Sequence, residues 1–151
     1  MPRQQHRHEQ FMNEAIKEAK NALSKDEVPI GAVIVCQGQI IARAHNLTET
    51  LNDVTAHAEM QAITAAASHL GGKYLNECIL YVTVEPCVMC AGACFRSQVR
   101  MVVFGAKDTK NGYRSISNKI LHPKTTVVEG IMEHECSKLI KEFFKGKRDF
   151  L

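Results

Sequence analysis

Three residues of the chain have the types and spacing of metal ligands: His57, Cys87 and Cys90. The two cysteines are separated by three positions, so on a helix their sulfurs project from one face. Pro86 directly precedes Cys87 and suits the first turn of a helix, where the partial positive charge favours thiolates. Two thiolates and one imidazole supply three ligands for Zn²⁺ and leave the fourth position for water, an arrangement typical of catalytic zinc sites.

Two neighbouring residues bear on the chemistry of this site. Cys94 lies on the same helical face, roughly 10 Å beyond Cys87 at ~1.5 Å per residue, too far to share an ion held at the helix start. We therefore predict that Cys94 is a small buried residue. Glu59 follows His57 closely, and its carboxylate can take a proton from water and pass it to a substrate nitrogen. The set predicts a hydrolase that attacks a polar, carbonyl-like or amidine-like carbon.

A Cys-x-x-Cys pair by itself has other interpretations, because redox motifs and structural zinc knuckles also contain it. A redox pair has no use for a helix-borne His57-Ala58-Glu59, and a zinc knuckle requires four protein ligands. The combination therefore favours catalytic zinc over both alternatives.

The surrounding segments predict an α/β fold that can bring these residues together. Apolar periodicity and turn residues predict helices over 11–24, 57–70, 87–97 and 133–145, and strands over 30–36, 39–44, 79–84, 101–105 and 126–129. The Gln37-Gly38 turn between the first two strands predicts a hairpin. This alternation implies a three-layer sandwich, a mixed five-stranded sheet with helices on both faces. Both ligand-bearing helices begin at one edge of the sheet. We predict that residues 1–10 are a disordered tail and that 11–151 form a single domain.

Length and composition fit one globular domain: 151 residues, 45% hydrophobic and 23% charged. No apolar run approaches the ~20 residues of a membrane span, and the polar start of the chain does not resemble a secretory signal. We expect no membrane association and a cytoplasmic protein. In a reducing compartment the four other cysteines are expected to be incidental and unpaired: Cys36, Cys78, Cys94 and Cys136.

Charge is distributed unevenly along the chain. Residues 100–151 contain 11 Lys and Arg against 6 Asp and Glu, a net charge of +5, whereas residues 1–99 contain 8 against 10, a net charge of −2. A basic C-terminal third indicates a polyanionic partner, although a solvated helix face would show the same bias. The segment 107–124 and the aromatic and basic ending 143–148 are the candidates for binding nucleic acid.

His57-Ala58-Glu59 followed by Pro86-Cys87-Val88-Met89-Cys90 resembles the zinc-dependent nucleoside and nucleobase deaminases. Within that superfamily, the resemblance is to the tRNA adenosine deaminases and covers nearly the whole chain. It is also carried by Glu27–Val33, Ala44–Asn46, Thr55–Glu59, Leu80–Ala93 and Val103–Ala106.

The resemblance implies a cytidine-deaminase-like fold and a homodimer that converts adenosine to inosine at the wobble position of a tRNA anticodon stem-loop. It implies one Zn²⁺ per chain on His57, Cys87 and Cys90, with Glu59 as the catalytic proton shuttle. The substrate-binding residues that it implies are Asn46, Ala58, Val28, Val84 and Asp108.

Several alternatives remain open at this point. Asn46 could be a turn residue, and Val28, Val84 and Asp108 could be core and turn residues. The function could be that of a free-base or nucleoside deaminase, such as a guanine or cytidine deaminase, which would not need a basic exterior. A zinc-bound RNA-binding module without catalysis is a further alternative, and the presence of Glu59 argues against it.

Overall fold

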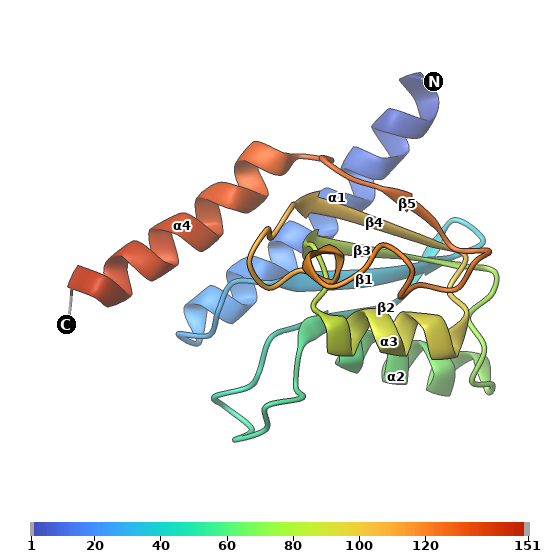
Figure 1. Cartoon of the computed structure of the whole chain (residues 1–151), viewed down its shortest axis with the longest axis horizontal. Coiled ribbons are helices and arrows are strands. Elements are labelled where there is room, and N and C mark those ends of the chain that lie inside the picture. Colours follow the sequence, from blue (N-terminus) through green and yellow to red (C-terminus); the bar gives the residue numbers. More distant parts are fainter. Residues whose placement is uncertain (1, 150–151) are drawn as a thin grey trace.

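A mixed five-stranded sheet lies between two layers of helices in the computed structural model, which describes residues 2–149 (Figure 1). The elements follow in the order α1 (Pro2–Ser24), β1 (Gly31–Cys36), β2 (Gln39–His45), α2 (Ala58–Leu70), β3 (Cys78–Val84), α3 (Val88–Ser97), β4 (Met101–Ala106), the 3₁₀ turn η1 (Tyr113–Ser115), β5 (Thr126–Val128) and α4 (Glu133–Asp149). The three-layer α/β sandwich predicted from the sequence is confirmed.

The strands are arranged in the order β2-β1-β3-β4-β5. β1 is antiparallel to both β2 and β3, whereas β3, β4 and β5 run parallel to one another. The β1–β2 connection is the predicted hairpin: Gln37 and Gly38 both have positive φ, 53° and 77°, as a two-residue type I′ turn requires. Because β3 and β4 are parallel, their C-terminal ends lie at the same edge of the sheet.

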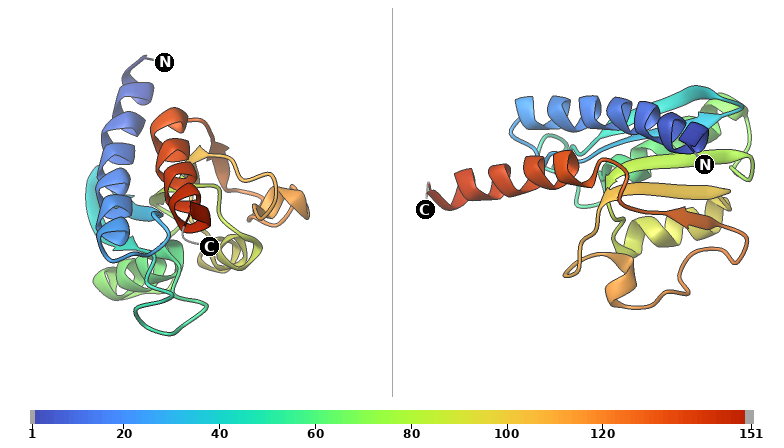
Figure 2. Two further views of the ribbon diagram at one scale, coloured as in Figure 1. Left: turned by 90° about the vertical axis from the view of Figure 1, so that its left-hand side faces the viewer. Right: turned by 90° about the horizontal axis from the view of Figure 1, so that it is seen from above.

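Each face of the sheet has its own apolar core, because successive side chains of a strand point to opposite faces. Ile34 and Leu80 lie in the core beneath α2 and α3, and Val33 and Tyr81 lie in the core beneath α1 and α4. Figure 2 shows the two pairs of helices on opposite sides of the sheet. This packing holds α2 and α3 side by side, with both helices beginning at the edge where β3 ends (Figure 1).

The beginning of the chain differs from its prediction. Residues 2–10, predicted to be a disordered tail, form the first turns of α1. The His8 ring lies 2.8 Å from the Tyr81 hydroxyl, and the Phe11 and Tyr81 ring centroids are 5.3 Å apart. These contacts dock the helix on β3, whereas the local sequence is too polar to show apolar periodicity before Phe11.

The last helix also extends beyond its predicted end at residue 145. Cys136, Leu139 and Ile140 of α4 belong to the core that also contains residues of β1, β3 and β4, and the C-terminal half of the helix projects past the sheet (Figure 2). The Lys147 ammonium lies 2.7 Å from the Asp26 carboxylate, which joins this projecting half to the α1–β1 connection. None of the helices within residues 2–149 has the length and apolar character needed to cross a membrane.

Candidate active site

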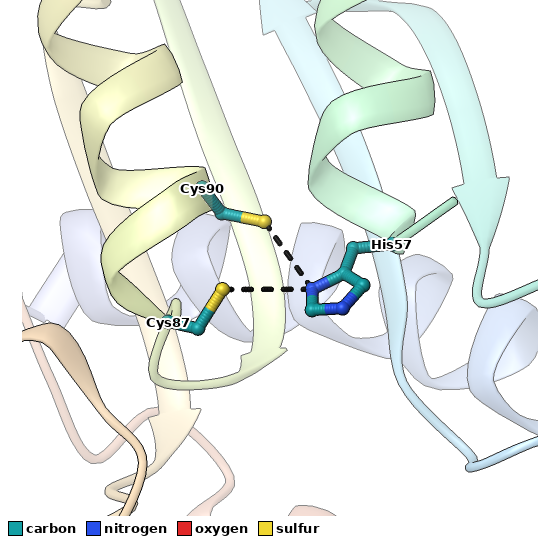
Figure 3. Close-up of side chains that lie close together, drawn as sticks. All are labelled: His57, Cys87 and Cys90. Carbon is teal, nitrogen blue, oxygen red and sulfur yellow. Dashed lines mark hydrogen bonds between the residues drawn. The ribbon is translucent and has the colours of Figure 1, made fainter. Parts of the chain in front are cut away.

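The start of α2 and the start of α3 bring His57, Cys87 and Cys90 together (Figure 3). His57 and Cys87 occupy the N-cap positions of their helices, in extended backbone conformations, and Cys90 lies in the first turn of α3. The buried strand β3 ends at Val84 and leads the chain directly to Cys87. The neighbouring helix starts therefore place one imidazole opposite two thiols.

The distances within this group suit a tetrahedral ion. His57 Nδ1 lies 3.6 Å from Cys87 Sγ and 3.5 Å from Cys90 Sγ, and the three donor atoms all lie within 4.8 Å of one another. Bonds of about 2.3 Å to sulfur and 2.0–2.1 Å to nitrogen at tetrahedral angles separate two ligand atoms by roughly 3.5 Å. The group can thus hold a metal ion. It is the only such group of His, Cys, Asp and Glu side chains found within residues 2–149.

The protonation of the three side chains is linked. A hydrogen bond with the Cys90 thiol and another with His57 lower the pKa of Cys87 to about 4, although burial opposes the shift. The hydrogen bond between Cys90 and Cys87 raises the pKa of the Cys90 thiol. The hydrogen bond between His57 and Cys87 raises the pKa of the His57 imidazole. Cys87 is therefore a thiolate at neutral pH, the form that binds metals.

Glu59 is buried in the first turn of α2, with only 4% of its surface exposed. Burial raises its pKa to about 7, since a charged carboxylate is disfavoured away from water. Such a carboxyl group can both accept and donate a proton near neutral pH. Cys94, by contrast, is fully buried in the core beneath α3 and outside the metal-binding group, as its spacing predicted.

A cavity of about 280 Å³ opens beside this group. Its lining comes from five parts of the fold: Val28, Ile30, Asn46, Thr48, His57, Ala58, Glu59, Val84, Glu85, Cys87, Asp108, Asn111, Ile140 and Phe144. The structure thus brings His57, Cys87 and Glu59 to the same cavity as all five residues for which substrate binding was predicted. Larger hollows elsewhere on the surface are lined by neither His57 nor Glu59.

Sequence reasoning missed Glu85, whose side chain is 2% exposed and lines the cavity. It accepts hydrogen bonds from the Asp108 and Arg114 backbone N–H groups, each at 3.2 Å, and from Arg114 Nη2 at 3.0 Å. Burial alone would raise the pKa of Glu85, but these bonds outweigh it and lower the pKa. In the sequence, only its position directly before Pro86 could have indicated that Glu85 lies at the site.

The loop after β4 is shaped around Glu85. A Cβ atom at Gly112 would lie 2.2 Å from Glu85 Oε2, so only glycine lets the loop approach this closely. Arg114, which the sequence suggested as part of a nucleic-acid-binding segment, is instead paired with Glu85 and Glu129. The carboxylate therefore holds in place the loop that carries Asp108.

The sequence analysis also did not place Ile140 and Phe144 of α4 in the site, and they line the cavity although they are far from the ligands in sequence. Ile30, Thr48 and Asn111 are further lining residues that were not predicted. Nothing local in the sequence distinguishes Ile140 and Phe144 from other apolar residues of an amphipathic helix. Together with Val28, Ile30 and Val84 they give the cavity apolar walls, while Glu59, Asn46 and Asp108 supply polar groups. Such a combination suits a flat, polar small ring.

Comparisons with known proteins agree with this site. The family model described as MafB19-like deaminase matches residues 6–148. The tRNA-specific adenosine deaminase of Bacillus subtilis (strain 168) is 50% identical over 145 residues, which cover 93% of this chain and 90% of the relative.

Two solved structures extend the comparison. A structure from a study of A-to-I editing by tRNA:A34 deaminases has a TM-score of 0.80 and 44% identity, covering 86% of this chain and 98% of that chain. A guanine deaminase from Nitrosomonas europaea has a TM-score of 0.77 and 25% identity, covering 89% of this chain and 83% of that chain. The chain belongs to the MafB19-like deaminase family, among the tRNA-specific adenosine deaminases.

Proposed function

We propose that this deaminase converts adenosine to inosine at the wobble position of a tRNA anticodon, with one bound Zn²⁺ per chain as cofactor. The observation that carries the proposal is a single cavity lined by His57, Cys87 and Glu59, in a chain 50% identical to a tRNA-specific adenosine deaminase. The overall reaction adds water to the amidine carbon of adenine and releases ammonia.

His57, Cys87 and Cys90 are the residues that would hold the zinc. The fit is supported by the donor set, one imidazole and two thiols, and by separations of 3.5 and 3.6 Å between Nδ1 and the two sulfurs. The lowered pKa of Cys87 supplies a thiolate without help from the metal. When bound, zinc lowers the pKa of a water molecule so that hydroxide is available near neutral pH.

Glu59 is proposed to move the protons. Its carboxylate accepts a proton from the attacking water and donates it to N1 of the adenine ring as C6 is attacked. It then takes the remaining hydroxyl proton and transfers it to the departing amino group, which leaves as ammonia. A pKa raised by burial to about 7 suits both directions of transfer.

The cavity walls are proposed to hold the base. Val28 and Val84 supply apolar surface for the ring faces, and the Asn46 amide supplies both a donor and an acceptor. Asn46 is only 5% exposed, and its Oδ1 accepts a long hydrogen bond of 3.4 Å from the Thr48 N–H. The Ala58 N–H lies in the first turn of α2, where backbone donors have no partner within the helix, and is proposed to orient the base.

The proposed partner is a tRNA anticodon stem-loop, whose unpaired bases can be turned into a pocket at low energetic cost. Asp108 lies at the rim between Lys107 and Lys110, which are both exposed. The net charge of +5 over residues 100–151 supports contacts to phosphates.

We also propose a cytoplasmic homodimer. Exposed Val88 and Phe95 on α3 support a partner surface on that side.

A guanine deaminase is the second candidate, because the Nitrosomonas europaea enzyme shares the fold. One experiment separates the candidates: incubate the zinc-loaded protein with an adenosine-34 anticodon stem-loop, bulk tRNA, free adenosine and guanine, and quantify inosine, xanthine and ammonia. We expect inosine from the RNA substrates alone. Product from guanine at a comparable rate would contradict the proposal, and binding of RNA without any product would indicate a non-catalytic module.

A further inference from the structure

Cys36 and Cys78 form a pair at the end of the sheet opposite to the candidate active site. Cys36 is the last residue of β1, Cys78 is the first residue of β3, and the two are direct partners in the antiparallel register. The bounds of β1 and β3 put both cysteines at the end of the sheet where the β1–β2 turn lies. Figure 1 shows α2 and α3 beginning at the other end. The pair is therefore separate from the Cys87 and Cys90 group.

The backbone around Cys78 sets the spacing of the pair. The Cys78 N–H donates to the Leu75 carbonyl at 3.0 Å, and the Cys78 carbonyl accepts from the Arg100 N–H at 3.0 Å. Neither group is directed at Cys36, so the two cysteines form a non-hydrogen-bonded pair. Such pairs have Cα atoms about 4.5 Å apart, within the roughly 4.4–6.8 Å that disulfides span.

Both side chains point to the same face of the sheet and belong to the core beneath α2 and α3. Burial, together with a hydrogen bond to the Cys36 thiol, raises the pKa of Cys78 to about 12. As direct register partners on one face of the sheet, the two side chains are neighbours in the reduced protein. Oxidation would require no change of strand register.

The pair is also accessible. A cavity of about 410 Å³ is lined by both cysteines together with His69, Tyr74 and Glu77. Cys36 is partly exposed while Cys78 is buried, so a reagent entering the cavity meets Cys36 first. Cys94 and Cys136 differ from this pair because each is buried and neither has a cysteine as its strand partner.

We propose that Cys36 and Cys78 are an oxidisable dithiol, which a low-molecular-weight disulfide converts into a cross-strand disulfide. The Cys36 thiolate attacks one sulfur of the reagent, which forms a mixed disulfide and releases one thiolate. Cys78 then loses its proton and attacks the Cys36 sulfur, which releases the second thiolate. The protein loses two electrons and two protons, and the reagent is reduced to two thiols.

The cross-link would join the ends of β1 and β3 and close a loop that contains β2 and α2. Closing this loop restricts the unfolded chain, so we expect the oxidised protein to have a Tm roughly 5–15 °C higher. His57, Cys87 and Cys90 lie at the other end of the sheet, and zinc should stay bound. The inference does not depend on the proposed activity.

The test is to titrate the reduced, zinc-loaded protein with oxidised glutathione and to map thiols by peptide mass spectrometry under acidic conditions. We expect a peptide pair joined through Cys36 and Cys78, the rise in Tm, and no zinc release detected by a colorimetric chelator. Reducing agent should reverse the shift. Oxidation confined to Cys87 and Cys90 with release of zinc would overturn the inference.

Single substitutions test the order of the steps. Cys78→Ser should retain glutathione on residue 36 as a trapped mixed disulfide. Cys36→Ser should show neither an adduct on Cys78 nor a change of Tm, which makes it the matched control. Alanine at either position serves if the serine variant does not fold. A stable glutathione adduct on Cys36 of the unsubstituted protein, without the cross-link, would also overturn the inference.

Discussion

At the scale of single residues, the proposed function assigns metal binding and proton transfer to different side chains. His57, Cys87 and Cys90 place their donor atoms within 4.8 Å of one another. Glu59 is outside this group, buried, with a pKa raised to about 7 by burial. A substitution of Glu59 should therefore affect chemistry without affecting the metal, and a substitution of a ligand should affect both.

Glu59→Gln retains the size of the side chain but cannot accept a proton. We expect zinc content and RNA binding to be unchanged and the rate of inosine formation in single turnover to fall by ~10² or more. Glu77→Gln is the matched control, because Glu77 is exposed at the other end of the sheet. A near-normal rate for Glu59→Gln would assign the proton transfer to another residue.

Cys87→Ala removes one of the three donors, and we expect loss of stoichiometric zinc and of activity, measured by elemental analysis and by inosine formation. Cys94→Ala is the control on the same helix, and it should retain its zinc because Cys94 lies outside the group. Zinc retained in full by Cys87→Ala would contradict the ligand assignment.

Treatment of the unsubstituted protein with a strong chelator should abolish activity, and added Zn²⁺ should restore it.

At the scale of elements, the junction between β3 and α3 organises the loop after β4. Glu85 is the connecting residue, since it accepts hydrogen bonds from the Asp108 and Arg114 backbones and pairs with the Arg114 guanidinium. The same buried carboxylate therefore contributes both to the stability of the fold and to the position of Asp108 at the cavity.

Glu85→Gln should lower the free energy of unfolding at pH 7 by about 1–3 kcal/mol, because Arg114 loses its buried charged partner. The folded-state pKa of Glu85 lies below the unfolded value of roughly 4.3, so its contribution is fully present above that pH. The contribution is lost as pH falls through the folded-state pKa. The difference in free energy of unfolding between the two proteins, measured with urea, should therefore narrow as the pH falls below about 4.3.

Two controls accompany this measurement. Zinc is first removed from both proteins, so that loss of metal in acid does not contribute. Glu129→Gln makes the same charge change at the other partner of Arg114, but its side chain is 51% exposed and we expect an effect of less than about 1 kcal/mol. Equal effects of the two substitutions would show that Glu85 has no special role in holding the loop.

At the scale of the whole molecule, α4 joins the cavity to the basic end of the chain. Ile140 and Phe144 line the cavity, while Lys145, Lys147 and Arg148 follow on the part of the helix that projects past the sheet (Figure 2). Lys147 is paired with Asp26, so its charge is partly compensated. The three cations follow the cavity-lining Phe144 within one helical turn, so under the proposed function they are candidates for contacts to the phosphates of the stem-loop.

Replacement of Lys145, Lys147 and Arg148 by Ala should raise the KM for the anticodon stem-loop and leave zinc content and single-turnover chemistry unchanged. Phosphate contacts displace counterions, so log K falls with log salt by about 0.7–0.9 per contact, and the triple variant should show a flatter slope. Binding is measured by fluorescence anisotropy at several salt concentrations.

The control is a double variant, Lys17→Ala and Lys20→Ala, on α1, which should keep the original slope. Free adenosine should show almost no salt dependence, because it has no phosphates. An unchanged salt slope in the triple variant would indicate that the RNA-binding surface is the 107–124 loop instead. Equal turnover of free adenosine and stem-loop would contradict recognition of RNA.

The sequence by itself determined most of the secondary structure and predicted the three side chains that the fold brings together as a possible metal site. Few residue types can bind zinc, so potential ligands are few. Two local patterns can be recognised without knowing the fold: the i, i+3 cysteines after Pro86 and the triplet His57-Ala58-Glu59. Helix and strand periodicity is equally local, which explains why the five strands, the Gln37-Gly38 hairpin and the three-layer arrangement were predicted.

Only the tertiary structure decided which distant residues meet. The contacts of His8 and Phe11 with Tyr81 hold residues 2–10 as the first turns of a helix. Arg114 forms an ion pair with Glu85, and Ile140 of α4 lines the cavity. Cys36 and Cys78 became neighbours through the pairing of β1 with β3. Each of these contacts joins segments far apart in the chain, and the energy that selects them comes from packing against the common sheet, which local periodicity does not encode.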